Sequence, residues 1–176
     1  MINLKLILAL SISIFFSSNT LAQFINLQIR VEPELSATVE QDLNFGQLVV
    51  NSGPSIIELG DINMGIFNIR SYYTQNVFVQ LQVPDALTHI NPAINDVIPL
   101  ELGVAYNNSG TRNLDESIIL SENFGFLPIY SATSTGYTTN TEIWQEMYLY
   151  VFGSIIIGNV NEGEYNGEVT LLIEYD

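Results

Sequence analysis

The sequence predicts an all-β sandwich of antiparallel strands. Apolar residues recur with period two in several segments, and turn signals separate these segments at intervals of roughly ten residues. No segment combines a helix cap, sufficient length and an apolar stripe of helical spacing. The chain has 176 residues, which favours one domain.

The first residues have the pattern of a signal peptide. A basic residue, Lys5, precedes the apolar run 6–16, and small residues end the segment at Ala22. This run is shorter than the roughly 20 residues that cross a bilayer, and every later apolar stretch is interrupted by acidic residues, Asn, Pro or Gly. We therefore expect residues 1–22 to be a signal peptide, residues 23–176 to be a single domain, and no membrane span after cleavage.

A strand is predicted directly behind the cleavage site. Its alternating apolar positions are Ile25, Leu27, Ile29 and Val31. The charged, proline-containing stretch 32–34 follows, and it is a candidate hinge.

Further strands are predicted along the rest of the chain. They cover 43–50, 55–59, 65–70, 77–83 and 169–175, with a turn at 51–54. Residues 147–157 are nearly continuous apolar sequence, so a central strand or a bent pair of strands is expected there, with a bulge or corner at Gly153. Residues 121–140 have aromatic residues among Ser, Thr and Gly, which indicates a long loop or an irregular hairpin.

Charge and cysteine content exclude several functions. Four basic residues oppose 19 acidic ones, for a net charge of −15. Nucleic acids and anionic membrane surfaces are therefore excluded as partners, because both require cations. The absence of cysteine removes disulfides, thiolate metal sites and cysteine nucleophiles.

The residues of catalytic type form no recognisable constellation. His89 is the single histidine, and neither a second histidine nor a cysteine accompanies it. A G-x-S-x-G nucleophile elbow is absent. Carboxylate pairs occur at Glu32 and Glu34 and at Asp115 and Glu116, but such a pair hydrolyses glycosides only across a cleft. We predict a protein that is not an enzyme and has no catalytic residues.

Calcium is the one metal that the sequence brings into consideration, and no other cofactor is expected. Asp61 and Asn63 place oxygen side chains at alternate positions before Gly65, as in a calcium loop, but the downstream bidentate glutamate is missing. A second group of oxygen side chains occurs at 159–164. Ordinary polar turns are the favoured interpretation of both segments.

Two motifs carry a resemblance to a known family. The first contains Asp42, Leu43, Phe45 and Gly46, and the second contains Gly163, Tyr165 and Gly167 and leads into a last strand that ends at Tyr175. Leu43 and Phe45 are expected to fill the core, the glycines to permit turns or close approach, and Tyr165 to form a tyrosine corner.

Together these motifs resemble the bacterial family catalogued as domain of unknown function 4402, and the ends of the chain are similar to those of spore-coat-U-like and other pilus-subunit domains. The resemblance implies an immunoglobulin-like β-sandwich. It also implies export by a Gram-negative bacterium to the periplasm, the cell surface or the medium, and a surface or fimbria-like role without catalytic residues. Unlike the disulfide-bearing pilus subunits, this chain lacks cysteine.

Two functions remain open at this point. In the first, residues 25–31 add to an open sheet edge of another copy or of another surface subunit, as in structural or adhesive fibres. The same segment can instead pair within its own domain. In the second, the protein is a solitary periplasmic or surface carbohydrate-binding module. Its candidate ligand contacts are Phe124, Phe126, Tyr130, Tyr137 and Trp144, although the same aromatic residues can equally cover one end of the sandwich.

Overall fold

A computed structural model describes residues 35–72, 76–128 and 144–175, and they form two antiparallel β-sheets. The strands of the larger sheet are β1 (Ser36–Gln41), β2 (Gly53–Ile57), β3 (Gly65–Tyr72), β5 (Ala86–His89), β6 (Val97–Asn107), β7 (Ile118–Ile119), β9 (Trp144–Ile157) and β10 (Tyr165–Asn166). Those of the smaller sheet are β4 (Asn76–Gln82), β8 (Phe124–Pro128) and β11 (Thr170–Tyr175). One 3-10 turn, η1 (Leu114–Glu116), is the helical element of this part of the chain.

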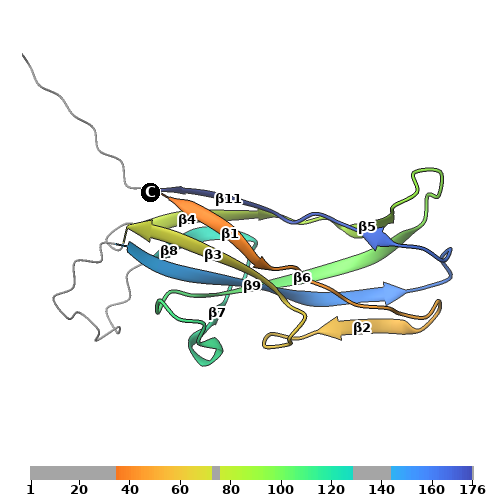
Figure 1. Cartoon of the computed structure of the whole chain (residues 1–176), viewed down its shortest axis with the longest axis horizontal. Coiled ribbons are helices and arrows are strands. Elements are labelled where there is room, and N and C mark those ends of the chain that lie inside the picture. Colours follow the sequence, from red (N-terminus) through yellow and green to blue (C-terminus); the bar gives the residue numbers. More distant parts are fainter. Residues whose placement is uncertain (1–34, 73–75, 129–143, 176) are drawn as a thin grey trace, which may run out of the picture. The chain divides into compact units, whose positions relative to one another are not determined.

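The two sheets pack face to face, which confirms the prediction of an all-β antiparallel sandwich (Figure 1). The larger sheet has the order β1-β3-β9-β6-β5-β10, with β2 also paired to β9 and β7 to β6. The smaller sheet has the order β11-β4-β8. The predicted signal peptide and the predicted strand at 25–31 lie outside the described residues.

Strand β9 is the centre of the molecule's larger sheet. It pairs with β6 along one edge and with β3 and then β2 along the other. Met147 and Leu149 face the smaller sheet in the main core, whereas Tyr148 and Tyr150 belong to a second apolar cluster on the opposite face. Burial on both faces accounts for the nearly continuous apolar sequence of this strand.

Gly153 allows two strands to approach closely within this sheet. A Cβ atom at this position would lie 2.1 Å from the backbone oxygen of Glu101 in β6. The strand continues through Gly153 without a register shift, pairing it with Leu102 and Ile57. The predicted bulge or corner is therefore wrong. The close approach of the β6 backbone requires the glycine here instead.

The strand predicted at 43–50 is wrong. That segment contains no strand, and the preceding residues 36–41 form β1. Gly46 has a positive φ of 75° and its N–H donates to the Asn44 side chain at 2.8 Å, which is a turn rather than a ladder geometry. The strands predicted at 65–70, 77–83, 147–157 and 169–175 are confirmed within a few residues.

Candidate functional site

A groove with a volume of about 1010 Å³ lies beside the main core. One rim is the segment 42–50, which follows β1, and the other is the segment 160–169, which precedes β11. Its floor consists of apolar side chains of β6 and β9, among them Leu100 and Ile155. These two side chains belong to an apolar cluster that includes no residue of the smaller sheet. The groove therefore lies where the larger sheet extends beyond its partner.

The 42–50 rim is held in place by hydrogen bonds to the loop between β2 and β3. The side-chain amide of Gln41 donates to two carbonyl oxygens of that loop at 2.6 and 2.7 Å. The N–H of Asn44 donates to the backbone oxygen of Asn63 at 3.0 Å. This rim is thus preformed, although its residues form no strand.

The 160–169 rim is fixed to the connection between β5 and β6. Asp96 accepts hydrogen bonds from the backbone N–H and the side-chain amide of Asn161, both at 2.7 Å. The backbone hydrogen bond, followed by the side-chain one, lowers the pKa of Asp96 below its ordinary range. Tyr165 donates its hydroxyl to the backbone oxygen of Asn161 at 2.9 Å. The hydroxyl–backbone contact expected of a tyrosine corner is therefore present, and the ring of Tyr165 is half-buried.

His89 lies at the end of β5 and contributes to the same rim. The N–H of Asn91 donates to its Nδ1 at 2.9 Å, so the proton of the neutral ring lies on Nε2, 3.3 Å from the backbone oxygen of Glu162. Its ring meets Tyr165 edge-on with centroids 4.9 Å apart. Gly163 permits this packing, because a Cβ there would lie 2.1 Å from the His89 ring. The histidine therefore serves the architecture of the rim.

The two sequence motifs meet at this groove. All of the motif residues except Tyr175 line it, and they come from opposite rims. Leu43 and Phe45 are half-buried against the apolar clusters, as expected of core-filling residues. Tyr175 ends β11 and packs against the main core. Residues far apart in the sequence thus build one feature, which periodicity alone does not predict.

Acidic side chains surround the apolar floor. They are Asp42 on the first rim and Glu162, Glu164 and Glu168 on the second, all of them exposed. The two arginines of the described residues, Arg70 and Arg112, do not line the groove. The groove therefore has an apolar base and a negatively charged border.

A polar cluster near the start of β9 includes one of these arginines, Arg112. Arg112 forms an ion pair with Glu40, and its guanidinium carbon lies 5.6 Å from the centroid of the Tyr148 ring. Asn68 donates to the same glutamate at 2.8 Å, and the Tyr148 hydroxyl donates to Glu146 at 2.8 Å. Burial, and then the Glu146 carboxylate, raises the pKa of Tyr148. These contacts connect β1, β3 and β9 and leave the acidic border of the groove without a cationic partner among the described residues.

The candidate ligand-contact residues are only partly described. Phe124 and Phe126 lie in β8 and are 52% and 61% exposed. Phe126 pairs with Phe78 of β4 at 4.9 Å between centroids, and both rings lie on the outer face of the smaller sheet. Trp144 begins β9, but its side chain, like Tyr130 and Tyr137, lies outside what the structure describes. The predicted long loop is therefore wrong at 124–128, which form the edge strand β8, and residues 129–140 lie outside the described residues.

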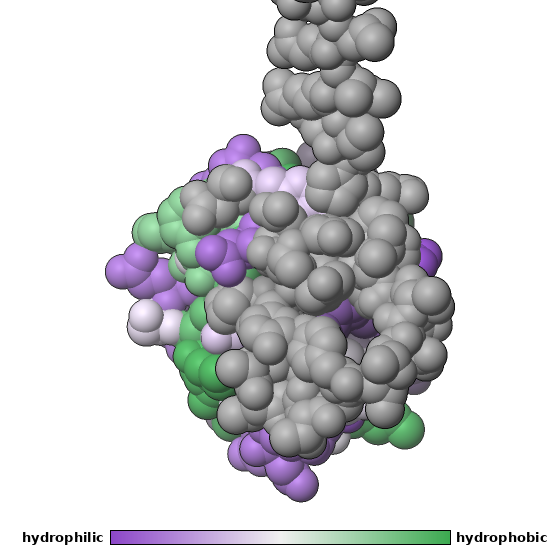
Figure 2. All heavy atoms as spheres, turned by 90° about the vertical axis from the view of Figure 1, so that its left-hand side faces the viewer, coloured by the Kyte–Doolittle hydropathy of each residue, from purple (hydrophilic) through white to green (hydrophobic). Residues whose placement is uncertain are grey.

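Other exposed apolar side chains are distributed over the larger sheet and its loops, including Val49, Ile56 and Ile62. Figure 2 views the end of the sandwich at which β3 ends and β4 begins, and the described side chains visible along its margin are partly apolar and partly hydrophilic.

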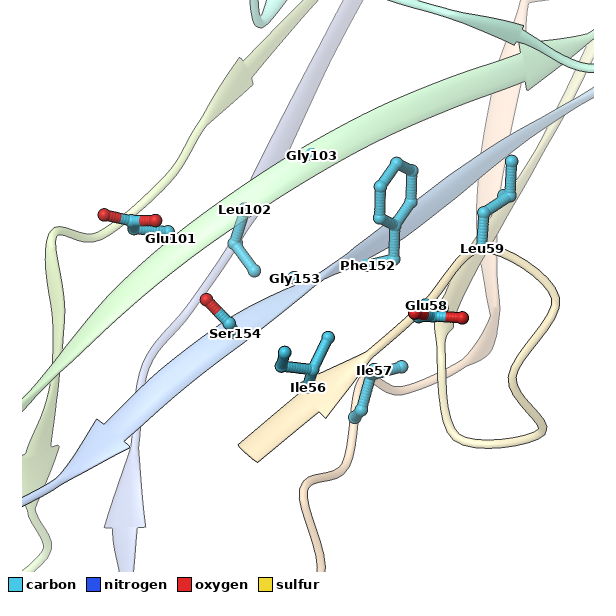
Figure 3. Close-up of a pocket in the computed structure, with 10 residues that line it drawn as sticks. All are labelled: Ile56, Ile57, Glu58, Leu59, Glu101, Leu102, Gly103, Phe152, Gly153 and Ser154. Atoms are coloured by element: carbon cyan, nitrogen blue, oxygen red, sulfur yellow. The ribbon is translucent and has the colours of Figure 1, made fainter. Parts of the chain in front are cut away.

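A shallow hollow of about 430 Å³ lies where β2, β6 and β9 meet (Figure 3). The Phe152 ring stands over Gly103, where a Cβ would lie 2.8 Å from a ring carbon. Glu58 and Glu101 lie on opposite sides of this ring, and Ser154 lies beside Gly153 (Figure 3). The hollow is open and mainly apolar, and it holds no histidine to activate the serine.

The calcium candidates form a turn. The Asp61 side chain accepts from the backbone N–H of Asn63 at 2.8 Å and lies 3.3 Å from the Asn63 side-chain amide. In the candidate second group, Asn161 is bound to Asp96 as described above. Within the described ranges, no group of three or more His, Asp and Glu side chains is arranged to hold a metal ion.

No helix in residues 35–72, 76–128 and 144–175 has the length and apolar composition needed to cross a membrane. The sequence matches no protein-family model, and no curated protein matches it at a significant level.

Proposed function

We propose that this protein is an exported, non-enzymatic surface or fimbria-like subunit that assembles by adding its N-terminal segment, residues 25–31, to an open edge of a sandwich. The supporting observation is the groove between the segments that adjoin β1 and β11. Export rests on the leader pattern of residues 1–22, and the resemblance in the two motifs agrees with a surface role.

The edges of the sandwich suit strand addition. β1 and β11 are the last strands at one end of each sheet, and among the described residues no strand pairs with their outer edges. An added strand would satisfy the backbone N–H and C=O groups of such an edge. Where such a strand continues past the end of β1 into the groove, its apolar side chains at alternate positions would face the floor formed by β6 and β9.

The mass of the assembled protein tests this proposal. Purified residues 23–176 and a version that lacks residues 23–34 are compared by size-exclusion chromatography with light scattering over a range of concentrations. We expect polymers whose mass increases with concentration from the first and a monomer from the second. Equal masses for the two would refute strand-mediated assembly.

A matched pair of variants tests the mechanism more closely. L27N/I29N changes the apolar face of the segment, whereas N26A/Q28A changes the opposite face. Because successive side chains of a strand point to opposite sides, only the first variant removes side chains from the floor. Polymer loss in L27N/I29N, with assembly retained in N26A/Q28A, is the expected result. Equal loss in both would argue against a strand in the groove.

The alternative function is that of a solitary carbohydrate-binding module, and the exposed rings on the smaller sheet favour it. Phe78, Phe124 and Phe126 form an aromatic surface on which a sugar ring can stack. A glycan array, followed by the fluorescence of Trp144, tests it, with F124A/F126A compared with L172A on the same face. Binding that F124A/F126A alone removes would support this function, and no binding to any glycan would exclude it for the glycans tested.

A further inference from the structure

We infer that the occupant of the groove is residues 23–31 of a second copy of this same chain, and that Arg30 identifies this segment by lying between the acidic rims. This inference rests on the strand-addition function proposed above and adds the identity of the partner and the residue that selects it.

Charge complementarity favours this segment as the occupant of the groove. The border of the groove has four exposed carboxylates, and neither described arginine lies among them. Arg30 is the single charged residue of residues 23–31. In a chain of net charge −15, two arbitrary surfaces repel each other, so a cationic segment is a distinctive partner for this groove.

Arg30 lies between two apolar positions of the alternating segment. If Ile29 and Val31 face the floor, Arg30 points the other way, toward the level of the rims. The floor then receives apolar side chains only, and the guanidinium group remains next to carboxylates and water. A buried unpaired charge is avoided, which makes the arrangement energetically acceptable.

The geometry of β1 distinguishes a second copy from the chain's own segment. The β1–β3 ladder has one end near the groove and one end away from it. Gln41 pairs with Ile66 at the end near the groove, and Ser36 pairs with Arg70 at the other end. A hairpin through residues 32–35 would place Arg30 opposite Ala37. This position precedes Asp42 by five residues, or about 17 Å along an antiparallel strand. The chain's own segment therefore leaves its charge distant from the rims.

The segment of a neighbouring copy is not tied to β1 of this copy, so its Arg30 can lie between the rims. Residues 23–34 extend up to about 40 Å when fully stretched, and they are connected to the sandwich at the end opposite the groove. The segment of one copy can thus enter the groove of the next with its full length. Such a contact joins two different surfaces, so repetition gives an open polymer, or a ring where the rotation between copies closes.

Charge reversal on both sides tests the inference in the mature chain, residues 23–176. R30E and E164R/E168R are each expected to weaken self-association roughly five- to tenfold, because exposed rim charges contribute modestly and each reversal replaces attraction by repulsion. The combined variant R30E/E164R/E168R restores opposite charges and is expected to recover most of the association. Light scattering gives the association constant, and circular dichroism verifies folding of each variant.

Two controls separate local from general charge effects. D115R/E116R changes the net charge by the same amount as E164R/E168R, but on η1 and away from the groove. It is expected to leave association within twofold of the wild type. The neutral variant E164Q/E168Q replaces E164R/E168R if the latter does not fold. Because salt screens the general repulsion between copies as well as the attraction of Arg30, the informative quantity is the difference: as salt is raised, association of the wild type should weaken relative to that of R30Q.

The outcomes distinguish the two proposals. If removal of residues 23–34 abolishes polymers but R30E assembles as the wild type does, strand addition stands and the role of Arg30 is refuted. Failure of R30E/E164R/E168R to recover would refute the pairing of Arg30 with these rims. If polymers persist without residues 23–34, both proposals are refuted.

Discussion

Two tyrosines illustrate how the surroundings of a hydroxyl group decide its contribution to stability. Tyr150 is fully buried, and its hydroxyl has no hydrogen-bond partner among the described residues. Burial raises its pKa, because the charged form would lose its hydration. Tyr165 instead donates its hydroxyl to the backbone of the 160–169 rim at 2.9 Å.

Removal of the Tyr150 hydroxyl and removal of the Tyr165 hydroxyl should therefore change the free energy of unfolding differently. Y150F should leave the free energy of unfolding unchanged or increase it, since an unsatisfied buried hydroxyl is removed. Y165F should lower it by about 1 kcal/mol, the net value of a typical hydrogen bond. Urea denaturation of both variants and the wild type measures these changes. A larger loss in Y150F than in Y165F would contradict this account.

The carboxylate of Asp96 makes part of the stability dependent on pH. Because its pKa is lowered in the folded protein, its contribution is present above the pKa of an unfolded aspartate. That contribution is lost as the pH falls below about 4 and through the lower folded pKa.

D96N should accordingly be less stable than the wild type at pH 7, and the difference should shrink toward pH 2.5. Thermal unfolding at a series of pH values measures it. The variant N95D, next in sequence, is a suitable comparison for a changed charge in the same loop. A difference for D96N that is independent of pH would show that the carboxylate's charge has no part in fixing the rim.

At the scale of the elements, the sequence predicted strands well where one face is apolar and the other polar. The alternation at 77–83 became β4, with Val77 and Val79 fully buried. β1 was missed because it is an edge strand whose residues are mostly exposed, so it has no apolar alternation to detect.

β6 was also missed, although its even positions from Ile98 to Tyr106 are apolar and buried or half-buried. Pro99 and Gly103 interrupt that pattern in the sequence. Pro99 is accommodated because pairing with β9 begins only at Leu100. Gly103 is accommodated because the Phe152 ring covers it. Both explanations depend on neighbours that are distant in the sequence, so residues 97–107 alone do not predict this strand.

The groove itself was not predicted, although its main residues had been singled out. The sequence predicts core and turn positions for the motif residues at 42–46 and 163–167, and several of them have these roles. Their convergence follows from the positions of β1 and β11 at the edges of their sheets. Strand order depends on pairing between distant segments, and a single sequence does not specify it.

The β6 backbone approaches β9 closely at Gly153, so a side chain at this position should destabilise the protein. G153A should lower the free energy of unfolding by about 1–3 kcal/mol or more, because the added methyl group meets the Glu101 backbone, which has little freedom to move. G158A is the matched control, since a Cβ at that position has open space. It should change stability by less than about 0.5 kcal/mol. Comparable losses in the two variants would disprove the close approach.

At the scale of the whole molecule, assembly should change hydrogen exchange in particular strands. The amides of β1 and β11 lie at the edges of the two sheets, whereas those of β9 lie between neighbouring strands. If a strand is added, exchange should slow in β1 or β11 of the polymer relative to the chain that lacks residues 23–34. Exchange in β9 should be the same in both, because its hydrogen bonds are already made. Slowing in β9 alone, with no change at either edge, would contradict strand addition.

The arrangement of β1 beside β3 has a mechanical consequence for a surface fibre. If the protein assembles through its N-terminal segment as proposed, a pull along the axis of β1 enters the sandwich at Ser36. The antiparallel ladder from Ser36 to Gln41 is then loaded in shear, so that its hydrogen bonds share the force instead of breaking one after another. A subunit connected in this way resists extension by the full length of its first ladder, even though that strand is the most exposed of its sheet's long strands.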